Sequence, residues 1–205
     1  MSKPIEKNLT KEQEQIVVGT ILGDGCLEFD GHIGTRLQIK QSKEKKEYVF
    51  WLFRKLENLC LTSPKRKKDT EQWYFSTQHL RVFTDLKEKF YSEERKLIPE
   101  DIEDYLDSSL ALAVWYMDDG TLDWRSEGSH YAFYLSTDCF WFKEADLLKE
   151  VLWNNFQVEA TVQNNCYRGK NHPRLYIGSK GRDKFLNTIE PFVVKEVFTH
   201  KLPPL

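Results

Sequence analysis

Two short segments of the sequence begin as apolar runs and end in an aspartate followed by a glycine. The first segment is residues 17–25, VVGTILGDG, and the second is residues 112–120, LAVWYMDDG. Asp24 and Asp119 occupy the same place in the two segments. Carboxylate oxygens are preferred ligands of Mg²⁺ and similar hard cations. A single Asp-Gly of this kind more often ends a helix, so the repetition is what indicates chemistry.

Further signals follow both segments in the same order. Gln41 follows the first aspartate by 17 residues, and Thr137 follows the second by 18, each at the end of a strand-like stretch. Lys96 begins the stretch KLIP and Lys201 begins the stretch KLPP, one in each part of the chain. An ordered recurrence of this kind indicates an internal duplication.

Apolar periodicity predicts the elements that position these residues. Residues 44–59 and 143–156 have apolar residues at helical spacing, and both motif segments are typical of buried helices. In residues 36–41, Leu37 and Ile39 alternate with polar residues, as in a half-buried strand, and residues 158–163 alternate in the same way.

Turn signals join these strands into hairpins. Asp30-Gly31 predicts a two-residue turn, and residues 126–129 are the matching turn of the second half. Each half, residues 1–104 and 105–205, is therefore expected to be an αββαββα unit. The expected class is α+β with antiparallel sheets, used twice about a pseudo-two-fold axis.

The two motif helices should pack against each other. The first is expected to start at Thr10, with Gln13 completing a capping box, and to run to Asp24, with Gly25 in the left-handed position beyond it. The second should run from Ser108 or Ser109 to Asp119.

Gly19 and Gly23 share one face of the first helix, and glycines at this spacing let two backbones approach closely. The matching face of the second helix contains Ala111, Val114 or Trp115, and Asp118. Packing along these faces would bring Asp24 and Asp119 together at one end.

That end would be strongly negative, because each helix C-terminus adds about half an elementary charge to the aspartates. The expected Mg²⁺ ligands are the carboxylates of Asp24 and Asp119 and the carbonyl oxygens of Gly23 and Asp118. Paired carboxylates that hold Mg²⁺ beside basic strands favour phosphodiester hydrolysis, in which the metal activates water and stabilises the leaving oxygen.

Four more side chains complete the expected catalytic set. Lys96 and Lys201 would offset charge on the transition-state phosphate, and Gln41 and Thr137 would orient the attacking water. Each has a simpler alternative. The lysines would then be surface residues before proline turns, Gln41 would cap a strand end, and Thr137 would cap the helix that follows it.

The charge distribution suggests one basic face. The 205 residues include 30 Lys and Arg and 32 Asp and Glu, for a net charge of −2, which excludes an all-over polycation but not a local basic surface. Residues 40–68 contain ten basic residues and three Glu, and residues 162–184 contain six basic residues and one Asp, whereas residues 85–107 are crowded with acids. We therefore expect a basic, DNA-binding face and an acidic back.

A two-stranded β-ribbon fits the DNA major groove, so residues on the expected strands are candidates for base contacts. These candidates are Arg36, Gln38, Lys40, Arg125, His130, Tyr134, Gln163, Arg168, Asn171 and Arg174. Lys65, Arg66, Lys67 and Lys68 are expected to contact phosphates, which position a protein without specifying sequence.

Taken together, the two segments resemble the motifs of the LAGLIDADG homing endonucleases in their single-chain, two-motif form. The stretch WYMDDG, residues 115–120, is very similar to the second motif of mitochondrial group I intron members, and residues 96–99 and 201–203 match the same branch. The resemblance covers roughly residues 12–203.

This resemblance implies that Asp24 and Asp119 are the metal-binding acids and that Lys96 and Lys201 are the basic residues of the active site. It places Gln41 and Thr137 as the polar residues at the strand ends. It implies a saddle of two four-stranded sheets over a long double-stranded DNA site, and Mg²⁺-dependent cleavage that leaves short 3′ overhangs, with Ca²⁺ as a non-cleaving substitute. Val114 and Asp118 replace small residues at the helix contact, which predicts wider packing there.

Two alternatives stay open on the same fold. One is an intron RNA maturase, and the other is a DNA-binding regulator without catalysis; the presence of both acids argues against the second. Cys26, Cys60, Cys139 and Cys166 form no Cys-x-x-Cys pair, and the sequence has no signal peptide or membrane span. We expect an intracellular monomer, in a mitochondrion, a chloroplast or a bacterial cytoplasm.

Overall fold

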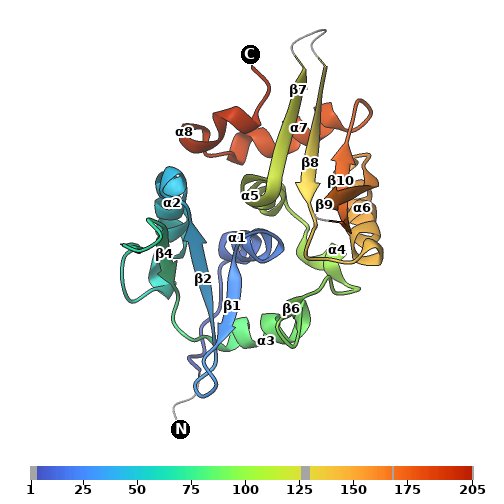
Figure 1. Ribbon diagram of the computed structural model, residues 1–205. Coiled ribbons are helices and arrows are strands. Elements are labelled where there is room, and N and C mark those ends of the chain that lie inside the picture. The colour runs from blue at the N-terminus through green and yellow to red at the C-terminus, as the bar shows by residue number, and fades with distance from the viewer. Residues whose placement is uncertain (1–3, 126–129, 168, 205) are drawn as a thin grey trace.

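Two four-stranded antiparallel sheets flank a central pair of helices in the computed structural model, which describes residues 4–125, 130–167 and 169–204 (Figure 1). The central helices are α1 (Lys11–Leu22) and α5 (Ser109–Asp119). One sheet has the strand order β1-β2-β4-β3 and the other β7-β8-β10-β9. The predicted α+β class with antiparallel sheets is confirmed.

The N-terminal part of the chain contains the first sheet and the helices that cover it. After α1, its elements are β1 (Cys26–Phe29), β2 (Thr35–Gln41), the 3-10 turn η1 (Lys43–Lys45), α2 (Lys46–Leu56), η2 (Glu57–Leu59), β3 (Lys65–Arg66), β4 (Trp73–Ser76) and α3 (Arg81–Phe90). The small hairpin β5 (Tyr91–Ser92) and β6 (Arg95–Lys96) and the helix α4 (Ile102–Tyr105) follow. The expected boundary at residue 104 falls within α4, and the division of the chain there stays a prediction.

The C-terminal part repeats the same order of elements. After α5 come β7 (Gly120–Arg125), β8 (His130–Ser136), α6 (Phe142–Phe156), β9 (Thr161–Tyr167), β10 (Lys170–Ile177) and α7 (Arg182–Ile189). The chain then continues through η3 (Glu190–Phe192), α8 (Lys195–Phe198) and η4 (Thr199–Lys201). The expected turn at residues 126–129 lies outside the described residues.

Helix α1 begins as its sequence predicts. The Thr10 hydroxyl accepts a hydrogen bond from the Gln13 backbone N–H (3.2 Å), and the Gln13 side chain accepts one from the Thr10 N–H (3.1 Å). The helix ends at Leu22, two residues before the expected Asp24. Gly25 is not in the left-handed region, contrary to expectation. Its N–H donates to the Thr20 carbonyl (2.7 Å), and a Cβ there would lie 2.9 Å from the Thr20 Cβ, so a close backbone turn requires this glycine.

The contact between α1 and α5 is close. A Cβ added at Gly19 would lie 2.5 Å from the Ala111 carbonyl oxygen, and one at Gly23 would lie 2.5 Å from the Asp118 Cβ. The two glycines therefore provide the space that Val114 and Asp118 fill, and the wider packing expected from those residues is not what the structure shows. Both helices are buried along most of their length, since sheets and other helices surround them.

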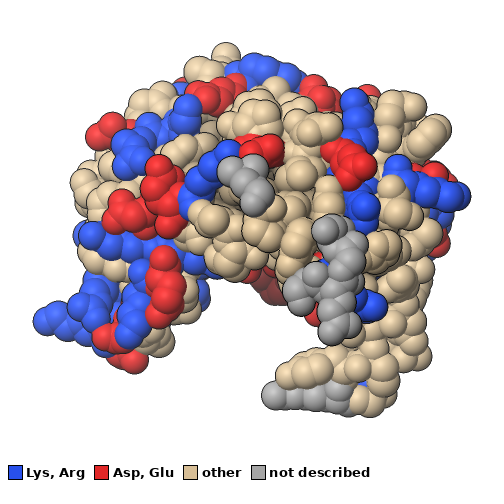
Figure 2. All heavy atoms as spheres, turned by 90° about the horizontal axis from the view of Figure 1, so that it is seen from above, with Lys and Arg blue, Asp and Glu red and all other residues tan. Residues whose placement is uncertain are grey.

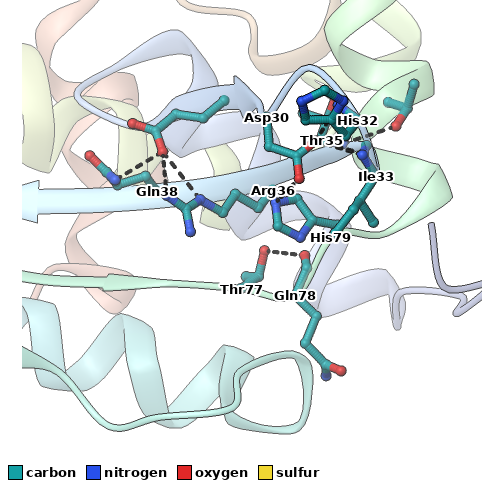
Figure 3. Close-up of polar contacts among 12 residues, drawn as sticks. Asp30, His32, Ile33, Thr35, Arg36, Gln38, Thr77, Gln78 and His79 are labelled. Atoms are coloured by element: carbon teal, nitrogen blue, oxygen red, sulfur yellow. Dashed lines mark hydrogen bonds and ion pairs between the residues drawn. The ribbon is translucent and has the colours of Figure 1, made fainter. Parts of the chain in front are cut away.

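The turn between β1 and β2 is longer than predicted. It spans residues 30–34, and the Asp30 carboxylate accepts hydrogen bonds from the backbone N–H groups of His32, Ile33 and Gly34 at 2.9, 2.7 and 3.1 Å (Figure 3). These bonds, that from His32 above all, lower the pKa of Asp30 to about 2. Asp30-Gly31 therefore lies in a five-residue loop and not in a two-residue turn. The loop is held by the Asp30 side chain, which accepts from three successive backbone N–H groups.

Each part of the chain sends a segment across to the other. Arg95 donates to both carboxylate oxygens of Glu144 on α6 (2.9 and 3.2 Å) and stacks on Trp141, with its guanidinium carbon 4.3 Å from the ring centroid. In the opposite direction, the Phe198 ring packs edge-on against Tyr48 of α2, with centroids 5.0 Å apart. One cross-contact is an ion pair and the other is aromatic.

Candidate active site and nucleic-acid interface

Asp24 and Asp119 lie at the adjoining C-terminal ends of α1 and α5. The Asp24 side chain is 40% exposed, whereas Asp119 is half-buried. Burial and the nearby charge of Asp24 raise the pKa of Asp119 to about 7. The predicted juxtaposition of the two acids is therefore present.

A third carboxylate, that of Asp118, adjoins Asp24. Asp118 is only 7% exposed, and its Oδ2 accepts a hydrogen bond from the Asp24 backbone N–H (3.1 Å). Its Oδ1 accepts a second bond from Gln41 Nε2 (3.0 Å). The same nitrogen of Gln41 also donates to Asp24 Oδ2 (3.0 Å). Burial, and then the charge of Asp24, raise the pKa of Asp118 to about 8.

Three lysines offset this charge. Lys96 Nζ donates to the Gly23 carbonyl (2.6 Å), and Lys201 Nζ donates to the carbonyl of Met117 (2.8 Å) and, at 3.5 Å, to that of Asp118. Lys45 Nζ lies 3.5 Å from Asp24 Oδ2. Burial and the charge of Lys45 lower the pKa of Lys201 to about 8. Each motif helix thus has a lysine bound to its last carbonyls, where the helix dipole favours a cation.

Thr137 does not reach the acids. Its side chain is fully buried and its hydroxyl donates to the Pro173 carbonyl (2.7 Å), which ties the end of β8 to β10. The prediction that Thr137 orients water is therefore wrong, and so is the cap alternative, because the residue before α6 is Trp141. The threonine side chain is too short to reach the acids as Gln41 does, and its hydroxyl is already bonded inside the sheet.

Two side chains that contact the Asp24 end of this cluster, those of Lys45 and Asp118, were not among the predicted catalytic side chains. Lys45 is one of several basic residues that follow Gln41, among them Lys43 and Lys46. Its position four residues after Gln41 is the one sequence signal that places it near Asp24. For Asp118 the sequence suggested the carbonyl alone. The doubled aspartate of the second segment was the available signal for its carboxylate.

The donor set fits a divalent metal that takes some of its ligands from the protein and the others from a substrate and water. The described residues contain no group of three or more His, Cys, Asp or Glu that could hold a metal by itself. Two carboxylates with helix-end carbonyls are an incomplete shell of hard oxygen donors. Mg²⁺ is usually held in this way, because it keeps waters and takes substrate phosphate oxygens.

The face of the first sheet that contains Arg36 carries polar side chains in cross-strand rows. Register pairs Glu28 with Arg36, Gln38 with Ser76, and both Lys40 and Lys65 with Tyr74. Directly paired residues share one face of a sheet. Arg36 and Gln38 extend side by side from β2 (Figure 3), and both donate to one oxygen of Glu28, from Arg36 Nη2 at 3.0 Å and from Gln38 Nε2 at 3.0 Å. Arg66 also binds Glu71.

The equivalent face of the second sheet has fewer charges. Arg174 stacks over Tyr134, 4.1 Å from the ring centroid, and its Nη2 lies 3.4 Å from Gln163 Oε1. Arg125 pairs with His130 across β7 and β8, on the face of Tyr134. The prediction that Asn171 contacts bases beside Arg174 is wrong. Strand alternation puts Asn171 on the face of Pro173 and Leu175, opposite Arg174. Arg168 lies outside the described residues.

The molecule is an arch with a hollow between two limbs, one from each sheet (Figure 2). Lys and Arg gather on the limb of the first sheet, where the exposed Lys65, Arg66, Lys67 and Lys68 follow its edge, while the other limb is mostly uncharged. Acidic side chains lie at the top of the hollow. Several basic residues counted in the sequence lie elsewhere, since Lys55 on α2 binds Glu12 and Arg182 and Lys184 are on α7.

Comparison with known proteins agrees with this geometry. The model of the LAGLIDADG DNA endonuclease family matches residues 14–185, and the chain belongs to that family. Among relatives, the cytochrome b mRNA maturase bI2 of Debaryomyces hansenii is 29% identical over 199 residues, covering 92% of this chain and 72% of the relative. The DNA endonuclease I-ChuI of Chlamydomonas applanata is 25% identical over 209 residues, covering 91% of this chain and 93% of the relative.

A solved structure shares the fold. The homing endonuclease I-WcaI bound to its DNA recognition sequence aligns with a TM-score of 0.84 at 24% identity, over 97% of this chain and 89% of that one. The saddle expected from the motifs is therefore the fold of the chain. In the part of the chain that the structure describes, none of the helices has the length and apolar character needed to span a bilayer.

Proposed function

We propose that this protein is a monomeric homing endonuclease that cuts both strands of a specific DNA site by Mg²⁺-dependent phosphodiester hydrolysis. The observation that carries the proposal is the meeting of Asp24 and Asp119 at the adjoining ends of α1 and α5, the helix pair that the two sheets flank. Each acid would serve one strand. A single chain that contains both motifs needs no second copy, so each half reads one half of a target that need not be palindromic.

The metal would be held by the carboxylates of Asp24 and Asp119 and by carbonyls of the motif ends, those of Gly23 and Asp118, together with phosphate oxygens. When bound, Mg²⁺ lowers the pKa of a water and stabilises the leaving oxygen. The half-buried Asp119 retains its proton more readily than a free aspartate, and a bound divalent cation would favour its ionised form.

The other residues act around that centre. Lys96 and Lys201 hold ammonium groups at the ends of the motif helices, where they would face the charge that builds on the reacting phosphate. Lys45 adds a third such charge on the side of Asp24. The Gln41 amide, 3.0 Å from both Asp24 and Asp118, would fix the orientation of the carboxylate and of a water beside it.

Sequence recognition would come from the two sheets. Arg36, Gln38 and Lys40 on one limb, and Arg125, His130, Tyr134, Gln163 and Arg174 on the other, would face base edges in the major groove. Lys65, Arg66 and Lys67 would contact phosphates. Cleavage of both strands would leave short 3′ overhangs, as the family resemblance implies.

A second candidate function is intron RNA splicing support. The relative from Debaryomyces hansenii is named a cytochrome b mRNA maturase, which favours this role beside cleavage. Binding of an intron transcript with the acids substituted would support it. The compartment, an organelle or a bacterial cytoplasm, stays a prediction.

In vitro cleavage selection tests the main proposal. A duplex library that includes intron-insertion sites is incubated with protein and Mg²⁺, beside an Asp119→Asn variant and a reaction with Ca²⁺. Cuts at one sequence with 3′ overhangs, absent from both controls, are expected. DNA binding without any cut would favour the regulator, and binding of intron RNA alone would favour the maturase.

A further inference from the structure

Asp118 is a buried carboxylate at the point where the two halves meet, and its side chain has no role in the reaction described above. The equivalent position of the first motif is Gly23. A Cβ on Gly23 would lie 2.5 Å from the Asp118 Cβ and 2.7 Å from its Oδ2. The carboxylate therefore fills the space that the glycine leaves, and only one of the two motifs can have a side chain there.

Both oxygens of Asp118 face donors from the other half of the chain. The Asp24 N–H fixes one oxygen at 3.1 Å, and Gln41 Nε2 fixes the other at 3.0 Å. Gln41 then donates its second hydrogen to Asp24 Oδ2, so the contacts form a closed ring. A carboxylate is the one side chain of this size that accepts at both ends.

The ring has no counterpart on the other side of the contact. Gly23 lacks a carboxylate, and Thr137, the counterpart of Gln41, donates to Pro173 within its own sheet. Asp119 is therefore oriented without such a bridge. The difference is built into two positions, since Gly23 opposes Asp118 and Thr137 replaces Gln41.

We propose that Asp118 is a positioning residue for one of the two strand cleavages, acting through Gln41 and the Asp24 backbone. It belongs to the half that contains Asp119 but sets the geometry at Asp24. The two cuts are then unequal in their dependence on the α1–α5 contact. The inference rests on the proposed endonuclease function.

Asp118→Asn is the sharpest test, because it keeps the shape of the side chain. Asparagine presents an NH₂ group to one of two donors, so only one hydrogen bond survives. Rotation of the Gln41 amide would restore the other but would turn its oxygen against the Asp24 carboxylate. Asp146→Asn is the matched control, since it makes the same substitution on the exposed face of α6.

The measurement is single-turnover cleavage of a duplex labelled separately on each strand, with DNA binding and thermal unfolding followed in parallel. In Asp118→Asn the rate on one strand should fall about ten- to a hundred-fold, the effect of leaving one buried hydrogen-bond donor without a partner. The other rate and DNA binding should change by less than about twofold. Asp146→Asn should leave the ratio of the two rates at its wild-type value.

A double-mutant cycle with Gln41→Met shows whether the effect passes through Gln41. After Gln41→Met, the substitution of Asp118 should add little, and the two single variants should slow the same strand. Gln41→Met also serves if Asp118→Asn fails to fold. Equal slowing of both strands, or additive effects, would overturn the inference and leave the endonuclease intact. A wild-type protein that cuts neither strand of any site would refute the proposed function, and this inference with it.

Discussion

The two halves of the molecule share the order of helices and strands from α1 to α3 and from α5 to α7, but they differ at several positions around the two acids. In the first half, Asp24 is exposed and has Gln41 and Lys45 as neighbours. In the second, Asp119 is half-buried with a raised pKa, and Thr137 has turned into the sheet. The duplicated backbone keeps the acids and the lysines in place, whereas the residues around them have diverged. Equivalent position does not imply equivalent environment.

The same contrast holds for the contacts by which each half grips the other. The first half reaches α6 through the Arg95–Glu144 ion pair, and the second reaches α2 through the packing of Phe198 on Tyr48. The limbs differ too, since one carries most of the exposed lysines and the other an arginine stacked on tyrosine. Four experiments can break or sharpen this comparison.

The largest effect is expected from the acids. Asp24→Asn and Asp119→Asn should each slow cleavage of one strand on the order of a thousand-fold, because a metal ligand is removed. Supercoiled plasmid should then be nicked instead of linearised. Strand-specific labels should show opposite strands intact in the two variants. If the same strand stays uncut in both variants, the assignment of one acid to each strand is wrong.

Phe198→Ala should have the largest effect on stability. Loss of a fully buried phenylalanine costs about 3–5 kcal/mol, and here it would open the aromatic grip on α2. Urea unfolding followed by tryptophan fluorescence measures the change in the free energy of unfolding. Phe192→Ala is the control, because that ring is partly exposed and should matter far less. The variant would also lose two cation–π contacts, because Lys45 Nζ and Lys201 Nζ lie 5.7 and 5.2 Å from the centroid of the Phe198 ring.

Glu144→Gln should cost about 1–3 kcal/mol at neutral pH, the range for a charge-assisted hydrogen bond. Although burial raises the pKa of Glu144, the hydrogen bonds from Arg95 and from the Trp141 and Ile98 N–H groups outweigh it, and the net pKa is lowered. The ionised form is therefore favoured in the folded state. This contribution is present above the unfolded pKa of about 4.3 and is lost as pH falls through the folded value. Wild type and variant should converge in acid, and parallel pH curves would contradict the ion-pair reading.

The smallest effect is expected in the salt dependence of DNA binding. Lys65→Ala with Lys67→Ala should reduce the slope of log K against log salt by about 0.9 for each phosphate that the protein no longer neutralises, without changing sequence preference. Arg174→Ala on the other limb should relax preference at one base pair by about 1–3 kcal/mol of discrimination. Binding titrations at several salt concentrations separate the two. Equal slopes for both variants would remove the distinction between the limbs.

Much of the frame could be predicted because it depends on local signals. The capping box at Thr10, the α5 boundaries and the meeting of Asp24 with Asp119 follow from short patterns read in order. The errors have physical causes that no local pattern contains. The predicted role of Thr137 failed because its hydroxyl donates to the carbonyl of Pro173, 36 residues further along the chain. Asn171 was assigned to the wrong face because alternation had to be anchored on the buried Pro173, and the Asp118 carboxylate was missed because its donors come from the other half.

The pairing of Gly23 with Asp118 has a consequence for building new proteins from these halves. Joining two copies of the second half would set two aspartates against each other where one Cβ leaves no room for another. Joining two copies of the first half would leave a void where the carboxylate stands, and Gln41 would lose an acceptor. Each half therefore packs correctly only against a half of the other kind. Recombining a first half with a second half from another such protein should give a folded protein, whereas joining two halves of the same kind should not.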